Sequence, residues 1–323
     1  MIRVTLFTRP DCALCDEVKS MLEGLGSSHP HQLIELNIEE DRALLRQYAE
    51  AIPVVSVGPY TLRAPILATD LKVAIAAAET GRETLAPLTG RAREQAVTLN
   101  RIVLNFARHW LAVFNLAVLV FVGIPFAAPV LMKAGATTPA RWIYAAYSPL
   151  CHQYAFRSWF LFGEQAAYPL ERAGLPGATY GRASGLPEND FLSARAFIGN
   201  ETVGYKVAFC ERDVSIWGGL FLAGVVFAFV RGRIRPLSTL GWLAIGILPI
   251  AVDGGTQLLS ALPGFSIFLP LRESTPALRT LTGLLFGAAN VWMAYPYVEE
   301  SMTETAAVVA AKLAGAAQAA SES

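Results

Sequence analysis

The sequence predicts two parts of different class: an α/β domain at the N-terminus, followed by an all-α polytopic membrane domain of about four spans. Of the 323 residues, 54% are hydrophobic and only 16% are charged, with a mean hydropathy of +0.41, which is too apolar for an ordinary soluble protein. Short strand and helix patterns alternate over the first eighty residues, whereas long apolar runs dominate beyond residue 110. The net charge of +0 gives no indication of a nucleic-acid partner.

A C-x-x-C motif, Cys12 and Cys15, lies between an apolar run at 4–7 and a helical pattern at 13–25. This placement is typical of a thioredoxin-like redox site. Cys12 would lie at a helix N-terminus, where free N–H groups and the helix dipole stabilise a thiolate, and Cys15 one turn later could resolve a mixed disulfide. Half of a zinc site is the alternative, but the first hundred residues offer only His29 and His31 as further imidazole ligands. We therefore favour redox chemistry over zinc binding.

The remaining elements of the first part follow from hydrophobic periodicity and turn residues. Glycine, serine and proline end the first helix, and residues 32–38 alternate as a half-buried strand should. Residues 60–63 pair back on the preceding strand through a turn at Gly58 and Pro59. The predicted strands are 3–8, 32–38, 52–57 and 60–63, and the predicted helices are 13–25, 41–51 and 67–79. The order β-α-β-α-β-β-α is that of a minimal thioredoxin fold.

The first 82 residues resemble the glutaredoxin-like family, in particular its small bacterial branch with T-R-P-x-C-x-L-C-D near the N-terminus, which reads here as Thr8 to Asp16. The resemblance implies that Cys12 is the nucleophile and Cys15 the resolving thiol. It also places Pro53 at the family's cis-proline, facing the active cysteine. Members that use glutathione carry a glycine pair before an Asp at the last helix, whereas this chain has Ala68 and Thr69 before Asp70. A protein dithiol is therefore at least as good a partner as glutathione.

The second part is predicted to cross the lipid bilayer four times. After a hinge at 84–90 and a basic helix at 91–108, apolar runs occupy 110–132, 214–230, 237–259 and 277–297. Four arginines precede the first run and three lie in the turn 231–236, which places both regions, and both termini, on the cytoplasmic side. The N-terminus enters a strand directly, so we expect no signal peptide. The expected location is the inner (plasma) membrane of a bacterial cell, with a reducing compartment around the dithiol.

We expect four regions: a glutaredoxin-like domain at 1–82, a basic linker helix at 83–108, an integral membrane domain at 109–300 and a flexible tail at 301–323. The loop 133–213 then lies outside. Within it, 141–162 is apolar but interrupted by Pro149 and Arg157, which predicts a membrane-hugging or re-entrant helix, and 163–204 is expected to be irregular.

Polar clusters interrupt the membrane part, where ionisable groups are costly and should face a polar interior. They resemble the marks of an uncharacterised bacterial membrane-protein family, a domain of unknown function, over about residues 110–297. The marks are C-H-Q-x-x-x-R-S, a later Cys-x-Arg, D-G-x-x-Q and R-x-x-T-G, which stand here at Cys151, Cys210, Asp253 and Arg279. Some relatives have a second Cys after the Arg, where this chain has Asp213.

Three interpretations of these clusters remain open. Cys151 and Cys210 could form an extracytoplasmic disulfide, or Cys151, His152, Cys210 and Asp253 could bind zinc or another divalent metal at one site. The groups could instead be a polar network that holds broken helices together. The leading function is a membrane-tethered thiol–disulfide oxidoreductase with a C-x-x-C dithiol. The alternative is a metal-binding or transport membrane protein with a glutaredoxin-like regulatory domain.

Overall fold

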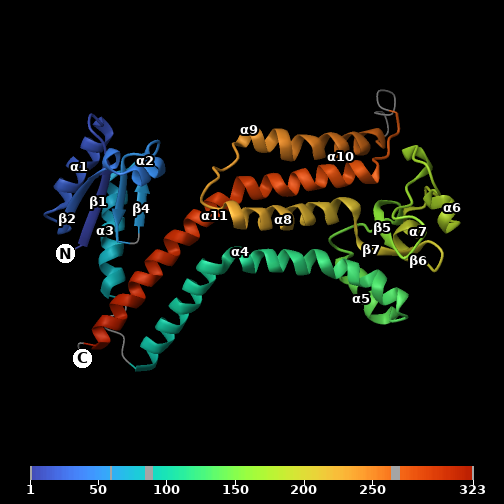
Figure 1. The fold of residues 1–323 in the computed structure, drawn as a ribbon, viewed down its shortest axis with the longest axis horizontal. Coiled ribbons are helices and arrows are strands. Elements are labelled where there is room, and N and C mark those ends of the chain that lie inside the picture. The colour runs from blue at the N-terminus through green and yellow to red at the C-terminus, as the bar shows by residue number, and fades with distance from the viewer. Residues whose placement is uncertain (1, 59, 84–89, 263–269, 322–323) are drawn as a thin grey trace. The chain divides into compact units, whose positions relative to one another are not determined.

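The computed structural model describes residues 2–58, 60–83, 90–262 and 270–321 (Figure 1). The chain divides into two compact units, Met1–Trp110 with Glu300–Ser323, and Leu111–Glu299. The predicted turn residue Pro59 and most of the predicted hinge, 84–89, lie outside the described residues.

The N-terminal domain is built on a four-stranded sheet of order β2-β1-β3-β4. Strand β1 pairs in parallel with β2 and antiparallel with β3, which in turn pairs antiparallel with β4. The elements are β1 (Ile2–Thr8), α1 (Ala13–Leu25), β2 (His31–Asn37), a 3-10 turn (Ile38–Glu40), α2 (Arg42–Tyr48), β3 (Val54–Val57), β4 (Tyr60–Arg63) and α3 (Ala68–Glu83). This topology confirms the predicted thioredoxin-like α/β fold.

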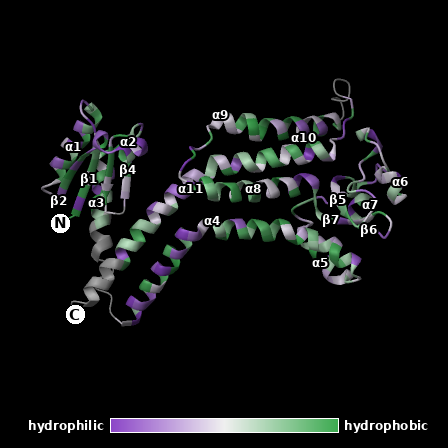
Figure 2. Ribbon diagram, viewed as in Figure 1, coloured by the Kyte–Doolittle hydropathy of each residue, from purple (hydrophilic) through white to green (hydrophobic). Residues whose placement is uncertain are grey.

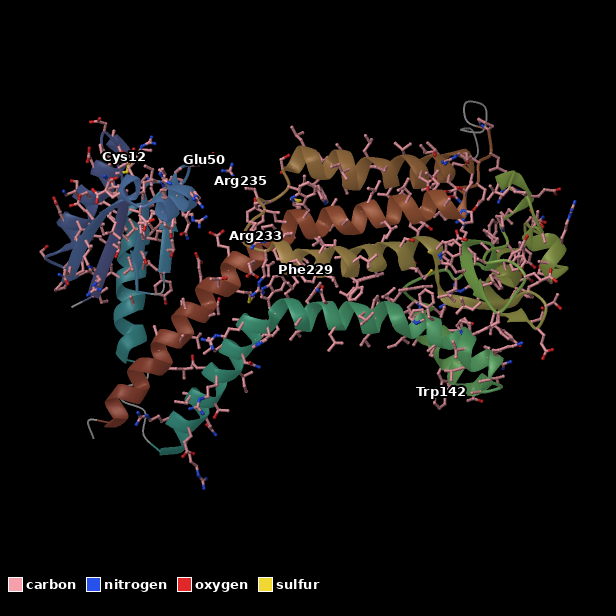
Figure 3. All side chains as sticks on the ribbon, viewed as in Figure 1. Cys12, Glu50, Trp142, Phe229, Arg233 and Arg235 are labelled. Atoms are coloured by element: carbon pink, nitrogen blue, oxygen red, sulfur yellow. A yellow bond between two sulfur atoms is a disulfide. The ribbon has the colours of Figure 1, made fainter. Side chains whose placement is uncertain are left out.

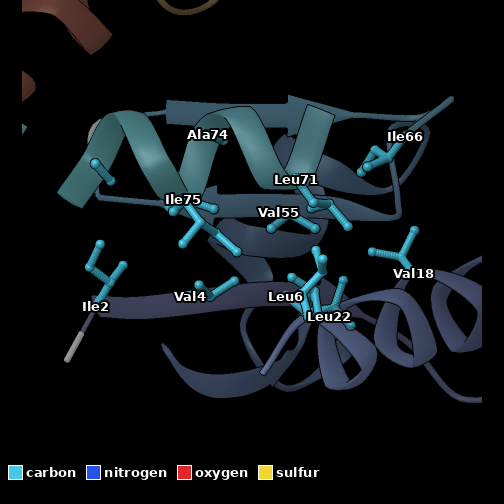
Figure 4. Close-up of a cluster of buried hydrophobic side chains, with 13 residues drawn as sticks. Ile2, Val4, Leu6, Val18, Leu22, Val55, Ile66, Leu71, Ala74 and Ile75 are labelled. Carbon is cyan, nitrogen blue, oxygen red and sulfur yellow. The ribbon is translucent and has the colours of Figure 1, made fainter. Parts of the chain in front are cut away.

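The two faces of this sheet bury separate apolar clusters. On one face, side chains of β1 and β3 meet those of α1 and α3, including Leu6, Leu22 and Ile75, none more than 1% exposed (Figure 4). On the other face, Phe7 and Tyr48 of α2 pack with ring centroids 4.7 Å apart. Because side chains alternate along a strand, neighbouring residues of β1 serve opposite faces. Each fully buried Leu or Ile contributes roughly 1.5–3 kcal/mol to the stability of the domain.

Long helices dominate the second unit, and their apolar character is visible along α4, α8 and α10 (Figure 2). Among the described residues, three helical segments are long and apolar enough to cross a membrane: Gly90–Lys133, Glu211–Val230 and Thr239–Ser260. The predicted linker helix and first span form one continuous helix, α4 (Gly90–Lys133). The third segment consists of α9 (Thr239–Trp242), a π-helical stretch (Leu243–Ile247) and α10 (Leu248–Ser260). Pro249 has no N–H to donate to the preceding turn, which favours this widened helix.

The fourth predicted span, 277–297, forms the first part of α11 (Pro276–Ser321), and the predicted tail continues the same helix to Ser321. Buried polar side chains, Arg279 and Thr282 among them, lower the hydropathy of this segment. The helix packs tightly on α8 (Glu211–Val230), because a Cβ at Gly287 would lie 2.3 Å from the carbonyl oxygen of Ile216. Gly283 and Gly287 therefore form a G-x-x-x-G contact of the kind that joins membrane helices.

The region 133–213 is more ordered than predicted. The apolar stretch 141–162 forms no re-entrant helix. It starts within α5 (Thr137–Tyr147), turns at 148–154, and ends in a 3-10 turn (Ala155–Arg157) and β5 (Ser158–Leu161). The expected irregular segment contains a 3-10 turn (Glu171–Ala173), α6 (Tyr180–Ser184), α7 (Phe191–Ala196) and β6 (Gly199–Asn200). Strands β5 and β6 flank β7 (Gly204–Cys210) in a three-stranded sheet of order β5-β7-β6. The burial of Val207 and Phe209 stabilises this sheet.

Candidate functional site

The N-terminal dithiol lies at the start of α1. Cys12 is the N-cap residue and its sulfur accepts the backbone N–H of Cys15 at 3.3 Å. The two sulfurs are joined in a disulfide, with Cα atoms 5.2 Å apart. Cys15 is 1% exposed, whereas Cys12 is only partly buried. Cys12 is therefore the more accessible of the two cysteines, at a helix N-terminus of the kind that favours thiolates.

Pro53 immediately precedes β3 and is buried, and the Ile52–Pro53 peptide bond is cis, as the resemblance implies. In the antiparallel pairing of β1 with β3, Phe7 lies opposite Val54. Pro53 and the loop that leads from Thr8 to Cys12 therefore lie at the same end of the sheet. Asp70 caps the last helix of the domain, since its carboxylate accepts the N–H of Leu67 at 3.1 Å.

A second group of reactive side chains converges in the membrane unit. This group consists of Cys151, Cys210 and Asp213, whose ligand atoms all lie within 4.8 Å of one another. Among the described residues, it is the one set of three or more His, Cys, Asp or Glu side chains placed closely enough to hold a metal ion. The sulfur of Cys151 accepts the N–H groups of Cys210 and Gln153, at 3.3 and 3.4 Å. The thiol of Cys210 donates to Oδ2 of Asp213 at 3.1 Å. A hydrogen bond with the Cys151 thiol, together with burial, raises the pKa of Cys210 well above its ordinary value.

The loop that carries Cys151 is held in place by the side chains of Gln153 and Lys206. Neither side chain was given a structural role from the sequence. Gln153 donates to the carbonyls of Tyr144 and Ala208, both at 2.9 Å. The buried Lys206 donates to the carbonyl oxygens of Gln153 and Arg195, at 2.7 and 2.6 Å, and burial lowers its pKa to about 7.

His152 and Asp253, the other two predicted metal ligands, lie outside this group. His152 is exposed and stacks on Tyr154, and the backbone turns at Gln153, which has a φ of 54°. Asp253 is 2% exposed and is fully used by other partners. It accepts from Arg212 at 2.5 Å, and from Arg272 and the hydroxyl of Ser274, both at 2.8 Å.

The remaining polar marks form a second set of buried ion pairs, separate from those of Asp253. Glu273 accepts two bonds from Arg157, at 2.8 and 3.0 Å, and also pairs with Arg279. Arg279 in turn donates to Glu211 at 3.1 Å. These pairs join the start of α8, the start of α11 and the loop after α5. A cavity of about 820 Å³ lies beside the network, lined by Arg172, Asp253, Arg272 and apolar residues of α10 and α11.

Sequence reasoning identified Cys151 and Cys210 but missed Asp213 as a member of their group. The C-x-x-D spacing at a helix start contained the signal, since residues at the N-cap and N3 positions lie side by side. Labelled side chains mark the two ends of the membrane unit. Arg233 and Arg235 follow α8 at one end, and Trp142 marks α5 at the opposite end (Figure 3).

Comparison with known proteins supports the division of the chain. Residues 3–79 match the model of the family described as "Glutaredoxin-like domain (DUF836)". Residues 194–293 match "Predicted membrane protein (DUF2085)", a shorter segment than the expected 110–297. The matched segment includes Cys210 and Asp253 but not Cys151. The chain is similar to the Uncharacterized protein MJ1492 of Methanocaldococcus jannaschii, 26% identical over 155 residues, which cover 48% of this chain and 67% of that relative. No solved structure gives a significant match.

The dithiol at the start of α1 thus lies in the segment that matches the first family, and the buried ion-pair network lies largely in the segment that matches the second. The chain joins a glutaredoxin-like domain to a predicted membrane protein domain of the DUF2085 family.

Proposed function

We propose that the chain is a membrane-bound thiol–disulfide oxidoreductase in which Cys12 and Cys15 carry the chemistry. The observation that carries this proposal is the bonded pair at the N-terminus of α1, with Cys12 the more accessible sulfur. The match to the glutaredoxin-like family is compatible with it. Pro53 would help to position the substrate disulfide beside Cys12.

The reaction begins from the reduced dithiol. The Cys12 thiolate attacks one sulfur of a substrate disulfide, which forms a mixed disulfide and releases one substrate thiolate. Cys15 then loses its proton and attacks the Cys12 sulfur, which releases the second substrate thiolate and leaves the Cys12–Cys15 disulfide. Two electrons have passed from the dithiol to the substrate, and a thiol donor must return them in the reverse exchange.

The partner that we favour is a protein dithiol or disulfide rather than glutathione. Asp70 caps helix α3 through Leu67, and the glycine pair of glutathione-using relatives is replaced by Ala68 and Thr69. Their Cβ atoms reduce the room for a peptide ligand to approach the backbone.

We propose the inner membrane of a bacterial cell as the location, with both termini cytoplasmic. The domain limits proposed are 1–82, 83–108, 109–300 and 301–323, with the first part of α11 as a fourth span. The arginines before and after the spans support this orientation. In it, roughly 30 Å of hydrocarbon separates the N-terminal dithiol from Cys151 and Cys210, so direct exchange between them is not expected.

The alternative proposal is a metal-binding or transport protein with a regulatory N-terminal domain. The observation that favours it is the convergence of Cys151 and Cys210 with a carboxylate. The originally predicted set of Cys151, His152, Cys210 and Asp253 would require His152 to leave Tyr154, and Asp253 to leave Arg212 and Arg272.

The test is disulfide exchange by the purified full chain in detergent, with a fluorescent disulfide-bonded peptide as the substrate. Cys12→Ser should abolish exchange, and Cys15→Ser should accumulate the mixed disulfide, because the resolving thiol is missing. Ser20→Ala, an exposed change in the same helix, should behave as the wild type. Exchange that survives Cys12→Ser would refute the proposal, and faster reduction by glutathione than by a small protein dithiol would overturn the partner assignment.

A further inference from the structure

We propose that Cys151, Cys210 and Asp213 bind a thiophilic divalent cation of the zinc class in the membrane unit. Two chain segments supply the donors: the loop after α5 carries Cys151, and the junction of β7 with α8 carries Cys210 and Asp213. Their ligand atoms lie within 4.8 Å of one another although Cys151 and Cys210 are 59 residues apart. This site is distinct from the dithiol of the N-terminal domain, and its test does not depend on the oxidoreductase activity.

The spacing of the donors suits tetrahedral coordination. With bonds of about 2.3 Å to sulfur and about 2.1 Å to oxygen, neighbouring ligand atoms around zinc lie roughly 3.5–3.8 Å apart. Oδ2 of Asp213 lies 3.1 Å from the sulfur of Cys210, and the sulfur of Cys151 is within 4.8 Å of both. Shifts of a few tenths of an ångström to about 1 Å would seat the three donors around one ion.

The donor types select the class of cation. Two thiolate sulfurs favour zinc and other soft or borderline metals over magnesium and calcium, which prefer oxygen. Both sulfurs also accept backbone N–H groups, from Gln153 and Cys210 to Cys151 and from Asp213 to Cys210. Such N–H groups help to orient the sulfurs, and a metal that binds them displaces the thiol protons.

The carboxylate of Asp213 separates this proposal from the alternatives. A disulfide between Cys151 and Cys210 has no use for a carboxylate against one of its sulfurs. A plain polar network would pair that carboxylate with a cation, as Asp253 and Glu273 are paired with arginines. In the described part of the chain, the hydrogen bonds of Asp213 run to Cys210 instead, and the next residue back, Arg212, is taken by Asp253. Among the described residues no cation is paired with this carboxylate, and a bound metal ion would supply one.

Three protein ligands leave a fourth tetrahedral position for water or a small ligand, as in catalytic rather than structural zinc sites. His152 does not fill this position, since its ring is exposed and stacked on Tyr154. Gln153 and Lys206 act on the geometry indirectly, because they hold the loop of Cys151 against β7.

The test uses the full chain in detergent with Cys12 and Cys15 replaced by Ser, so that the N-terminal thiols cannot bind metal. After reduction and chelation, the protein is loaded with zinc, and bound metal is measured by elemental analysis and by competition with a chromophoric chelator. We expect about one zinc per chain, lost in Cys151→Ser and in Cys210→Ser. Cobalt loading should give thiolate-to-cobalt charge-transfer absorption that disappears in the same variants.

Two substitutions at Asp213 make the test specific. Asp213→Asn should weaken zinc binding at least tenfold, whereas Asp213→Cys should restore it, because a thiolate replaces the carboxylate as the third donor. His152→Ala should bind zinc as the parent does, and a loss there would overturn the three-ligand assignment. Intact mass and thiol labelling distinguish the metal site from a disulfide and from a polar network. A chain two hydrogens lighter with no free thiol would establish the disulfide, and two free thiols without zinc would leave only the polar network; either result overturns the proposal.

Discussion

Arg279 offers a direct test of whether the buried ion pairs hold the membrane unit together. Its side chain is 3% exposed and pairs with the side chains of Glu211, 0% exposed, and Glu273, 2% exposed. The substitution Arg279→Met keeps an unbranched apolar stem but removes the guanidinium and its charge. Glu273 would retain Arg157, whereas Glu211 would have no cation partner among the contacts described.

The expected cost is that of leaving one buried carboxylate without its partner, about 3–5 kcal/mol. The membrane unit has 189 residues, as counted from 111 to 299. For a unit of this size, each kcal/mol lowers the melting temperature by about 2–4 °C, so the variant should melt on the order of 6–20 °C below the wild type.

A second substitution removes the uncompensated charge and provides the decisive comparison. The double variant Glu211→Gln with Arg279→Met should recover part of the loss, because a neutral amide is much cheaper to bury than a carboxylate. The assay is thermal unfolding in detergent, followed by tryptophan fluorescence. Arg141→Met, an exposed change of the same type in α5, should shift the melting temperature by less than about 2 °C.

Two results would refute this reasoning. Arg279→Met could melt within the range of the Arg141→Met control, which would mean that the network contributes little to stability. Alternatively, the double variant could be less stable than Arg279→Met alone. That result would mean that the unpaired carboxylate of Glu211 does not destabilise the folded protein.

Three further predictions concern packing, a buried lysine and topology. Gly287→Val should destabilise the unit strongly because a Cβ would meet the Ile216 carbonyl at 2.3 Å, whereas Gly123→Val, where nothing lies within 4 Å, should be tolerated in the same melting assay. Burial and the positive charge of Arg195 lower the pKa of Lys206 to about 7, while the Cys151 thiol opposes the shift. Between that pKa and the ordinary value of 10.5, the folded chain binds fewer protons than the unfolded chain. The free energy of unfolding of the wild type should therefore rise relative to that of Lys206→Met as the pH increases from about 7 to 9. A difference between the two that does not change with pH would contradict this. Reporter fusions after residue 318 and within 177–185 should report opposite sides of the membrane, and same-side signals would exclude the four-span arrangement.

Much of the N-terminal domain could be predicted from local sequence because its signals are local. An apolar strand, a C-x-x-C at a helix start and a proline before the third strand each depend on residues that are neighbours in the chain. The helix start also determines which thiol is exposed, since Cys12 caps α1 and Cys15 turns inward to 1% exposure. The apolar runs in the second part predicted membrane helices for the same reason, as length and hydropathy are properties of a single segment.

The arrangement of the polar groups in the membrane unit was decided only by tertiary structure. Cys210 and Asp253 lie in one family match, yet Asp253 pairs with Arg212 and Arg272, and Asp213 takes the place beside Cys210 and Cys151. No local pattern distinguishes these outcomes, because the partner of a buried charge is selected by which helix ends and loops meet in space. Burial makes that selection strict, since a charge removed from water needs a partner at hydrogen-bond distance wherever the fold can supply one.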